Sequence, residues 1–187
     1  MASDMIQVNR APVLTLWAAV VAERLGYKAD EALTLGRVLA GLNAQAKGRR
    51  LGIYHPREGE PDHKRAERAG EELTVALLGR EVPVVRNAEG VRATSGGRPM
   101  DAAGVQRYLE SKFGTDLAAV REALEELARS CRREELAAHA YALYEQFRPD
   151  VPAGKPGWGA TGELDLARIR QMAKRSQSQA SPGSPWP

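Results

Sequence analysis

The sequence predicts a mainly α-helical protein with six to seven helices and one small β-hairpin near residues 82–94. Two observations predict this class. Apolar residues recur at three- and four-residue spacing through most of the chain, as in amphipathic helices. Short alternating valine segments flank the turn sequence Asn87–Gly90, as in a hairpin. We expect three parts: a single helical domain with the hairpin over 1–150, a C-terminal arm over 151–175 and a disordered tail over 176–187.

The N-terminal region predicts two helices packed tightly against each other. The first, 12–25, has apolar residues around more than one face, so it should be largely buried and end at Gly26. The second, about 30–47, has a stripe of small residues that permits close approach. We therefore expect an antiparallel pair across 26–29. The small residues of the stripe are Ala32, Gly36, Ala40 and Ala44.

The middle of the chain is interrupted by glycine and proline over 48–61, with a short strand at 51–54 as one option. A third helix is expected over about 63–78, capped by Asp62 and ended by Gly79. The hairpin follows. Pro83 places its first strand at a sheet edge, and residues 95–97 end it.

The second half predicts three successive helices that begin near Asp101, Thr115 and Ser130, with the last closed by prolines after residue 148. Residues 153–162 have the composition of a linker. A last short helix is expected over 163–175, before the Ser/Gln/Pro-rich tail.

Composition limits the classes of function. The 187 residues are 43 % hydrophobic and 27 % charged, with a formal net charge of +3. That charge permits an anionic partner without requiring one. The single Cys131 excludes an intrachain disulfide and a Cys-rich zinc site. No apolar stretch is long enough for a bilayer, and the first residues lack a secretory pattern, so we expect a cytoplasmic protein with no membrane partner. The arginine-rich composition is typical of a GC-rich, bacterial-like genome.

Residues 21–35 resemble the helix-turn-helix motif of DNA-binding proteins. Ala22 and the turn glycine Gly26 have the spacing of that family, with apolar residues around them. The resemblance implies that the second helix enters the major groove. The flanking apolar residues are Val21, Leu25, Tyr27, Ala32 and Leu35.

A basic loop over 47–57 is the main candidate site. It carries four full positive charges and no acid, and guanidinium groups suit phosphate. Arginines on or near the hairpin extend this patch. The sequence therefore predicts non-enzymatic binding of DNA or another polyanion. The alternative is that the loop is simply exposed to solvent and that its positive charge is balanced by the acidic residues that follow it. The predicted contacts are Lys47, Arg49, Arg50 and Arg57, with Arg86, Arg92 and Arg98 as secondary ones.

No enzymatic centre, metal site or cofactor is predicted. The G-x-G-x-x-G pattern at 157–162 follows a proline-containing segment that cannot be a central strand, so it fails as a dinucleotide site. His55 and His63 lack the spacing of a metal motif. His139 falls on the apolar stripe of its helix, where a packing role is expected.

A second hypothesis is a helical protein-interaction or self-association module. The arm over 153–175 combines a tryptophan with apolar residues at helical spacing, which suits docking on a partner or on a second copy. The residues that would dock are Trp158, Leu164, Leu166, Ile169 and Met172.

Overall fold

The computed structural model describes residues 4–50, 71–152 and 160–179, except for the side chains of 47–50 and 71, and over these ranges the fold is α/β. The prediction of a mainly α fold is wrong. The hairpin at 82–94 is the centre of a four-stranded antiparallel sheet with strand order β2-β3-β4-β5, and β1 pairs with β6 in a second sheet. Along the chain the elements are β1 (Met5–Val8), α1 (Arg10–Arg24), α2 (Ala29–Arg50), β2 (Glu71–Leu77), β3 (Arg80–Asn87), β4 (Gly90–Ser95), β5 (Arg98–Pro99), α4 (Ala102–Phe113), a 3-10 turn (Gly114–Asp116), α5 (Leu117–Ser130), α6 (Arg133–Phe147), β6 (Gly162–Asp165) and α7 (Leu166–Gln179).

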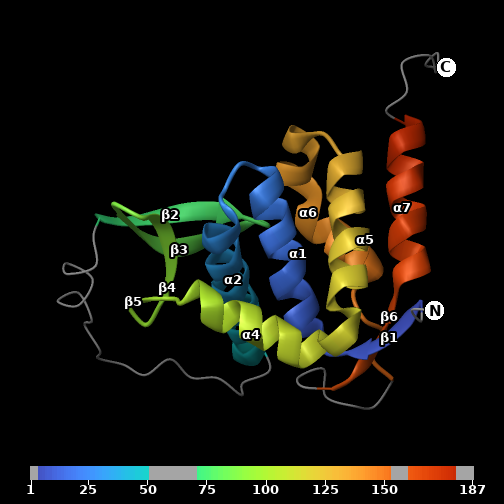
Figure 1. Cartoon of the computed structure of the whole chain (residues 1–187), viewed down its shortest axis with the longest axis horizontal. Coiled ribbons are helices and arrows are strands. Elements are labelled where there is room, and N and C mark those ends of the chain that lie inside the picture. Colours follow the sequence, from blue (N-terminus) through green and yellow to red (C-terminus); the bar gives the residue numbers. More distant parts are fainter. Residues whose placement is uncertain (1–3, 51–70, 153–159, 180–187) are drawn as a thin grey trace.

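Helix α1 is the centre of the apolar core. It lies between α2 on one side and α5 and α6 on the other (Figure 1). All its residues from Pro12 to Ala22 are buried, which confirms the predicted burial. The indole N–H of Trp17 donates to the backbone oxygen of Ala140 at 2.9 Å, and its ring meets Phe147 edge-on. The largest side chain of α1 is therefore buried with its polar atom satisfied.

The close pair of α1 and α2 confirms the prediction from the small-residue stripe. The two helices run in opposite directions, joined by a short turn (Figure 1). A Cβ built on Gly36 would collide with the backbone oxygen of Thr15 and lie 3.3 Å from the Cβ of Ala19. The backbones approach so closely because position 36 has no side chain. Helix α2 continues to Arg50, three residues past its predicted end.

Strand β2 occupies part of the segment predicted as a third helix. Its sequence EELTVAL is rich in good helix formers, which explains the error. Its apolar residues nevertheless alternate: Leu77 is buried and Leu73 and Val75 pack against the core. The turn to β3 uses Leu78 and Gly79, both at positive φ, as a two-residue type I′ turn requires. Pairing with β3 thus overrides local helix propensity.

Strand β3 is an interior strand, so the prediction that Pro83 marks an edge is wrong. The β3–β4 ladder ends at the pair Val84–Ala93, one residue short of Pro83. The hydroxyl of Thr94 instead donates to the Pro83 oxygen at 3.4 Å. Proline has no backbone N–H to donate, and at position 83 none is needed toward β4, because the β3–β4 pairing has already ended there. Residues 96 and 97 do not terminate the sheet; they turn β4 into β5.

The C-terminal elements belong to the same core as the body. Strand β6 pairs antiparallel with β1, and α7 packs along α5 at one end of the molecule (Figure 1). Leu164, Leu166 and Ile169 are fully buried. The helix predicted over 163–175 begins later, at Leu166, because residues 163–165 are taken up by the β1 pairing. It extends to Gln179, into the segment predicted as a tail.

A buried polar contact ties α2 to both the sheet and α6. The side-chain oxygen of Asn43, a residue 6 % exposed, accepts hydrogen bonds from the Arg80 guanidinium at 3.1 Å and the Tyr141 hydroxyl at 3.4 Å. A buried amide oxygen satisfied twice fixes the relative positions of three elements. No helix within the described ranges is long and apolar enough to cross a bilayer.

The two glycines of α2 should respond oppositely to the same substitution. Gly36→Ala places a methyl group against Thr15 and should lower the free energy of unfolding by about 1–3 kcal/mol. Gly41→Ala meets no atom within 4 Å and should raise it by about 0.5–1 kcal/mol, because alanine favours the helix. Urea unfolding of both variants measures the difference. Equal effects of the two substitutions would contradict the close approach of α1 and α2.

Candidate binding cleft

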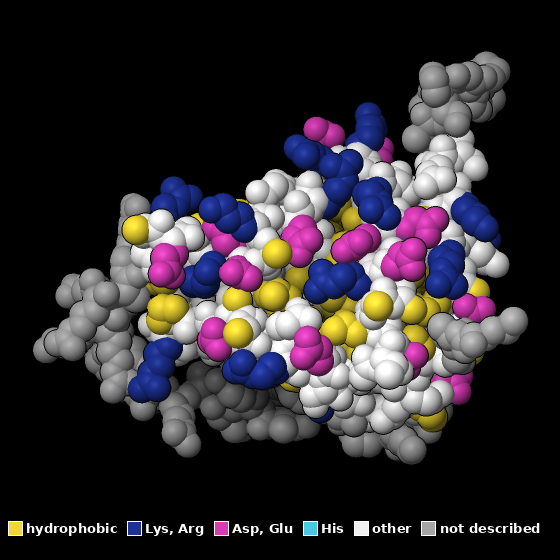
Figure 2. Space-filling model, viewed as in Figure 1, with side chains coloured by type: hydrophobic (Ala, Val, Ile, Leu, Met, Phe, Trp, Pro, Cys, Tyr) yellow, Lys and Arg dark blue, Asp and Glu magenta, His cyan; other side chains and the backbone are white. Residues whose placement is uncertain are grey.

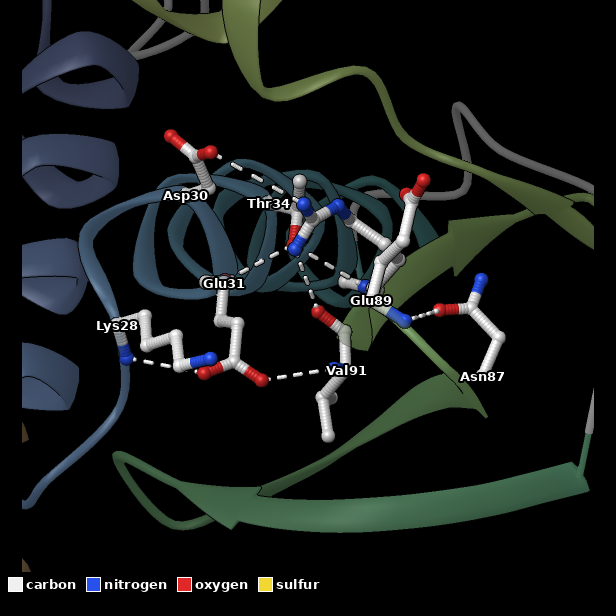
Figure 3. Close-up of polar contacts among 9 residues, drawn as sticks. Lys28, Asp30, Glu31, Thr34, Asn87, Glu89 and Val91 are labelled. Atoms are coloured by element: carbon white, nitrogen blue, oxygen red, sulfur yellow. Dashed lines mark hydrogen bonds and ion pairs between the residues drawn. The ribbon is translucent and has the colours of Figure 1, made fainter.

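Strand β5 pairs only with the end of β4, and the part of that edge left unpaired is covered by two side chains from the start of α2. The carboxylate of Glu31 accepts the backbone N–H of Val91 at 2.7 Å. One turn later, the hydroxyl of Thr34 accepts the N–H of Ala93 at 3.1 Å and donates to the Glu31 backbone oxygen. Figure 3 shows these side chains between the helix and the strand. The helix thereby satisfies amide donors that a neighbouring strand would otherwise have to pair.

Glu31 also stabilises the beginning of its own helix. Its second oxygen accepts the backbone N–H of Lys28, immediately before α2, at 3.0 Å. This is the carboxylate half of a capping box. On the strand side, a Cβ on Gly90 would lie 2.9 Å from Glu31 Oε2, and Gly90 has a φ of +122°. Glycine is therefore required there twice, for its backbone conformation and for the room that Glu31 needs.

The charge of Glu31 is stabilised although the residue is 8 % exposed. Burial alone would raise the pKa of its carboxyl group. The hydrogen bonds from the backbone of Lys28 and Val91, helped by the positive charges of Lys28 and Arg92, outweigh burial, so the pKa lies below its usual value. The carboxylate is thus a structural anion at the junction of helix and sheet.

An open cleft of about 780 Å³ adjoins this junction. It lies between the end of α1, the start of α2, the β3–β4 turn, the start of α4 and one residue of α5, with Arg92 of β4 and Pro99 of β5 also in the lining. Hydrophobic side chains are visible between acidic and basic ones on this face of the molecule (Figure 2). The residues that line the cleft are Glu23, Ala29, Asp30, Leu33, Asn87, Glu89, Arg92, Pro99, Met100, Asp101, Ala102, Ala103, Gln106 and Arg121.

The lining contains four carboxylates and two guanidinium groups. Arg92 donates to the Val91 oxygen at 3.0 Å and lies 4.0 Å from the carboxylate of Asp30. Arg121 lies 3.6 Å from Glu23 and 3.9 Å from Glu125. The pKa of the Glu23 carboxyl group is raised, mainly because the group is partly buried. The negative charge of Glu125 adds to this rise, and the positive charge of Arg121 opposes it. Each arginine of the cleft is therefore already next to a carboxylate of its own chain.

The predicted hairpin arginines do not share one face. The register pairs Arg86 with Val91 and Arg92 with Val85, so Arg86 and Arg92 point to opposite faces of the sheet. Arg86 and Arg98 are exposed, whereas Arg92 is half-buried in the cleft. The backbone of 47–50 forms the last turn of α2 rather than a loop. The side chains of Lys47, Arg49 and Arg50, and all of Arg57, lie outside the described residues.

The segment that resembles a helix-turn-helix spans the end of α1, the turn and the first turns of α2. Its second helix does not stand free, because Glu31 and Thr34 attach it to β4. Asp30 is exposed, at the mouth of the cleft. The two acids at the start of α2 thus have different roles: one holds the sheet and the other faces the cleft.

Among the described residues, no three His, Cys, Asp or Glu side chains form a group that could hold a metal ion. His55, His63 and Trp158 lie outside those residues. His139 is exposed on α6, so its predicted packing role is wrong. Its helix buries a different stripe, Leu136, Ala140, Tyr144 and Phe147.

The cleft was not predicted from the sequence. Its residues come from segments that are far apart along the chain, and their convergence depends on the sheet that was predicted only in part. The signal that was available is the pair Glu31 and Thr34, spaced to lie on one helix face. Comparison of the chain with protein-family models, curated proteins and solved structures gives no match.

Glu31→Gln should destabilise the protein in a pH-dependent way. At neutral pH the loss should be about 1–3 kcal/mol, because the amide cannot accept both backbone N–H groups as well as the carboxylate does. Since the folded pKa of Glu31 lies below its unfolded value, the carboxylate stabilises the fold above about pH 4 and less as the pH falls through the folded value.

The difference in unfolding free energy between wild type and variant should therefore shrink on acidification. Chemical unfolding at pH 7, 5 and 3 measures it, with Glu81→Gln on the exposed side of β3 as control. A difference that stays constant over this range would contradict the role of the Glu31 charge.

Proposed function

We propose that the protein is a non-catalytic interaction module that binds a short segment of a partner protein in the cleft. The observation that carries this proposal is the cleft itself: about 780 Å³, open to solvent, with apolar residues among charged ones. A peptide offers apolar side chains and backbone polar groups together, which such a lining can accommodate. The described residues that line it include no His, Cys, Ser or Lys that could act as nucleophile or neutral base.

The cleft supports a docking role better than the C-terminal arm does. Leu164, Leu166 and Ile169 are fully buried in the core of their own chain, and Met172 packs against that core. Their use in docking on a partner would require α7 to leave α5. The cleft, in contrast, is open without any rearrangement.

Filling the cleft should abolish peptide binding. Peptides selected on the wild-type protein from a random library should lose affinity by at least about tenfold, or about 1.4 kcal/mol, on Ala103→Trp. Ala103 is exposed and lines the cleft, so the indole occupies space that a ligand needs. Ala138→Trp, at an exposed position of α6, is the matched control. Fluorescence anisotropy measures both. Selected peptides that bind equally well to all three proteins would contradict the proposal.

Polyanion binding is a second candidate, favoured by the distribution of charge along the sequence. Residues 47–70 contain seven Lys or Arg and four Asp or Glu, so this segment alone accounts for the formal net charge of +3. Phosphate contacts release counterions, which makes affinity fall with salt. This candidate uses a different part of the chain from the cleft.

If the protein binds polyanions, its affinity for duplex DNA should fall as the salt concentration rises. The triple variant Lys47→Ala, Arg49→Ala, Arg50→Ala should reduce the log–log salt slope by roughly one unit for each lost phosphate contact. Arg129→Ala, Arg133→Ala, Arg175→Ala removes the same charge from exposed positions elsewhere and should change it less. Titrations at several salt concentrations measure the slopes. The absence of salt-sensitive binding by the wild type would exclude this candidate.

A further inference from the structure

The two positive charges of the cleft are held by the protein itself. Arg92 is 19 % exposed, with its guanidinium on the Val91 oxygen and near Asp30. Arg121 is 26 % exposed and lies within 4 Å of both Glu23 and Glu125. An incoming anion would have to compete with two carboxylates at Arg121 and with the hydrogen bond to the Val91 oxygen at Arg92. Neither arginine is therefore a favourable site for an acidic ligand.

The acidic side chains at the mouth of the cleft have fewer polar contacts within the protein than its two arginines have. Glu89 makes no side-chain hydrogen bond or ion pair with the other described residues. The side chain of Asp30 is 70 % exposed, and among the described residues its one ion pair is the 4.0 Å contact with Arg92. Figure 3 shows Asp30 on α2 and Glu89 on the β3–β4 turn reaching to the same side of the junction. Together, the two carboxylates give the mouth of the cleft a negative charge.

Apolar atoms lie beside these carboxylates in the same cleft. Leu33 is 7 % exposed, and Met100 is half-buried and packs against the core. Pro99 and Ala102 continue the apolar lining toward α4. A lysine or arginine side chain combines a charged end with an apolar stem, so it matches a lining in which carboxylates and apolar atoms alternate.

We propose that the segment bound in the cleft is basic, with a Lys or Arg whose charge lies near Asp30 and Glu89 and an apolar residue beside it that packs on Leu33 and Met100. This inference rests on the proposed function, because it specifies the ligand of the same cleft. The charge complementarity of the mouth selects the partner, and the apolar contacts supply a part of the affinity that salt does not screen.

The test begins with the composition of the selected peptides. Peptides that bind wild type and are blocked by Ala103→Trp should be enriched in Lys and Arg over Asp and Glu. One of them is then titrated against Glu89→Gln and Asp30→Asn, each of which should weaken binding about twofold to fivefold, as expected for an exposed ion pair. Glu122→Gln, an exposed acid of α5 outside the cleft, should leave affinity unchanged.

Charge reversal provides an independent measurement. Glu89 lies in a turn and its side chain supports no other described residue, so Glu89→Lys should fold normally and shift selection toward acidic peptides. Circular dichroism checks the fold. If the cleft-dependent peptides are acidic or uncharged, or if both neutralising variants bind as wild type does, the basic ligand is excluded while the cleft remains a binding site. If no selected peptide depends on the cleft, the proposed function itself is excluded.

Discussion

The N–H groups along one edge of β4 are the constraint on which this structure depends. A sheet edge buried against a helix must have its amide donors paired, because an unpaired buried donor costs about as much as a lost hydrogen bond. Glu31 and Thr34 pair them from α2. Helix α2 also packs closely against α1 at Gly36. Its contacts with β4 therefore fix the position of the sheet relative to the helical core. About two and a half turns beyond Thr34, Asn43 makes a second attachment of α2 to the sheet.

The cleft is the space that remains beside this attachment. Its walls are the first turns of α2, the turn before β4 and the start of α4, and each is held by contacts that do not involve a ligand. Asp101 caps α4 by accepting the N–H of Gly104, and Asn87 accepts the N–H of Glu89 in the β3–β4 turn. A site with such preformed walls loses little conformational entropy when a ligand binds.

The sequence allowed prediction of the parts determined by local spacing. The burial of α1, the tight approach of α2 at Gly36 and the hairpin around Asn87–Gly90 all follow from patterns within about twenty residues. The errors concern elements that depend on distant partners. Strand β2 is rich in residues that favour a helix. Strands β1 and β6 have four residues each, which is too short to show the apolar–polar alternation of a strand. The cleft depends on the missed strand pairing and on the contact of Glu31 with β4. The spacing of Glu31 and Thr34 places both on one helix face, but it does not show which strand they meet.

The pairing of β1 with β6 has a consequence for biosynthesis. Residues 5–8 are translated well before their strand partner, which comes at residues 162–165. At roughly 5–20 residues per second, β1 is without that partner for about eight to thirty seconds after it is translated. Throughout that interval Ile6 and Val8 lack the strand beside which they are finally buried. The β1–β6 sheet can therefore form only after the helices that lie between its two strands in the sequence have been translated.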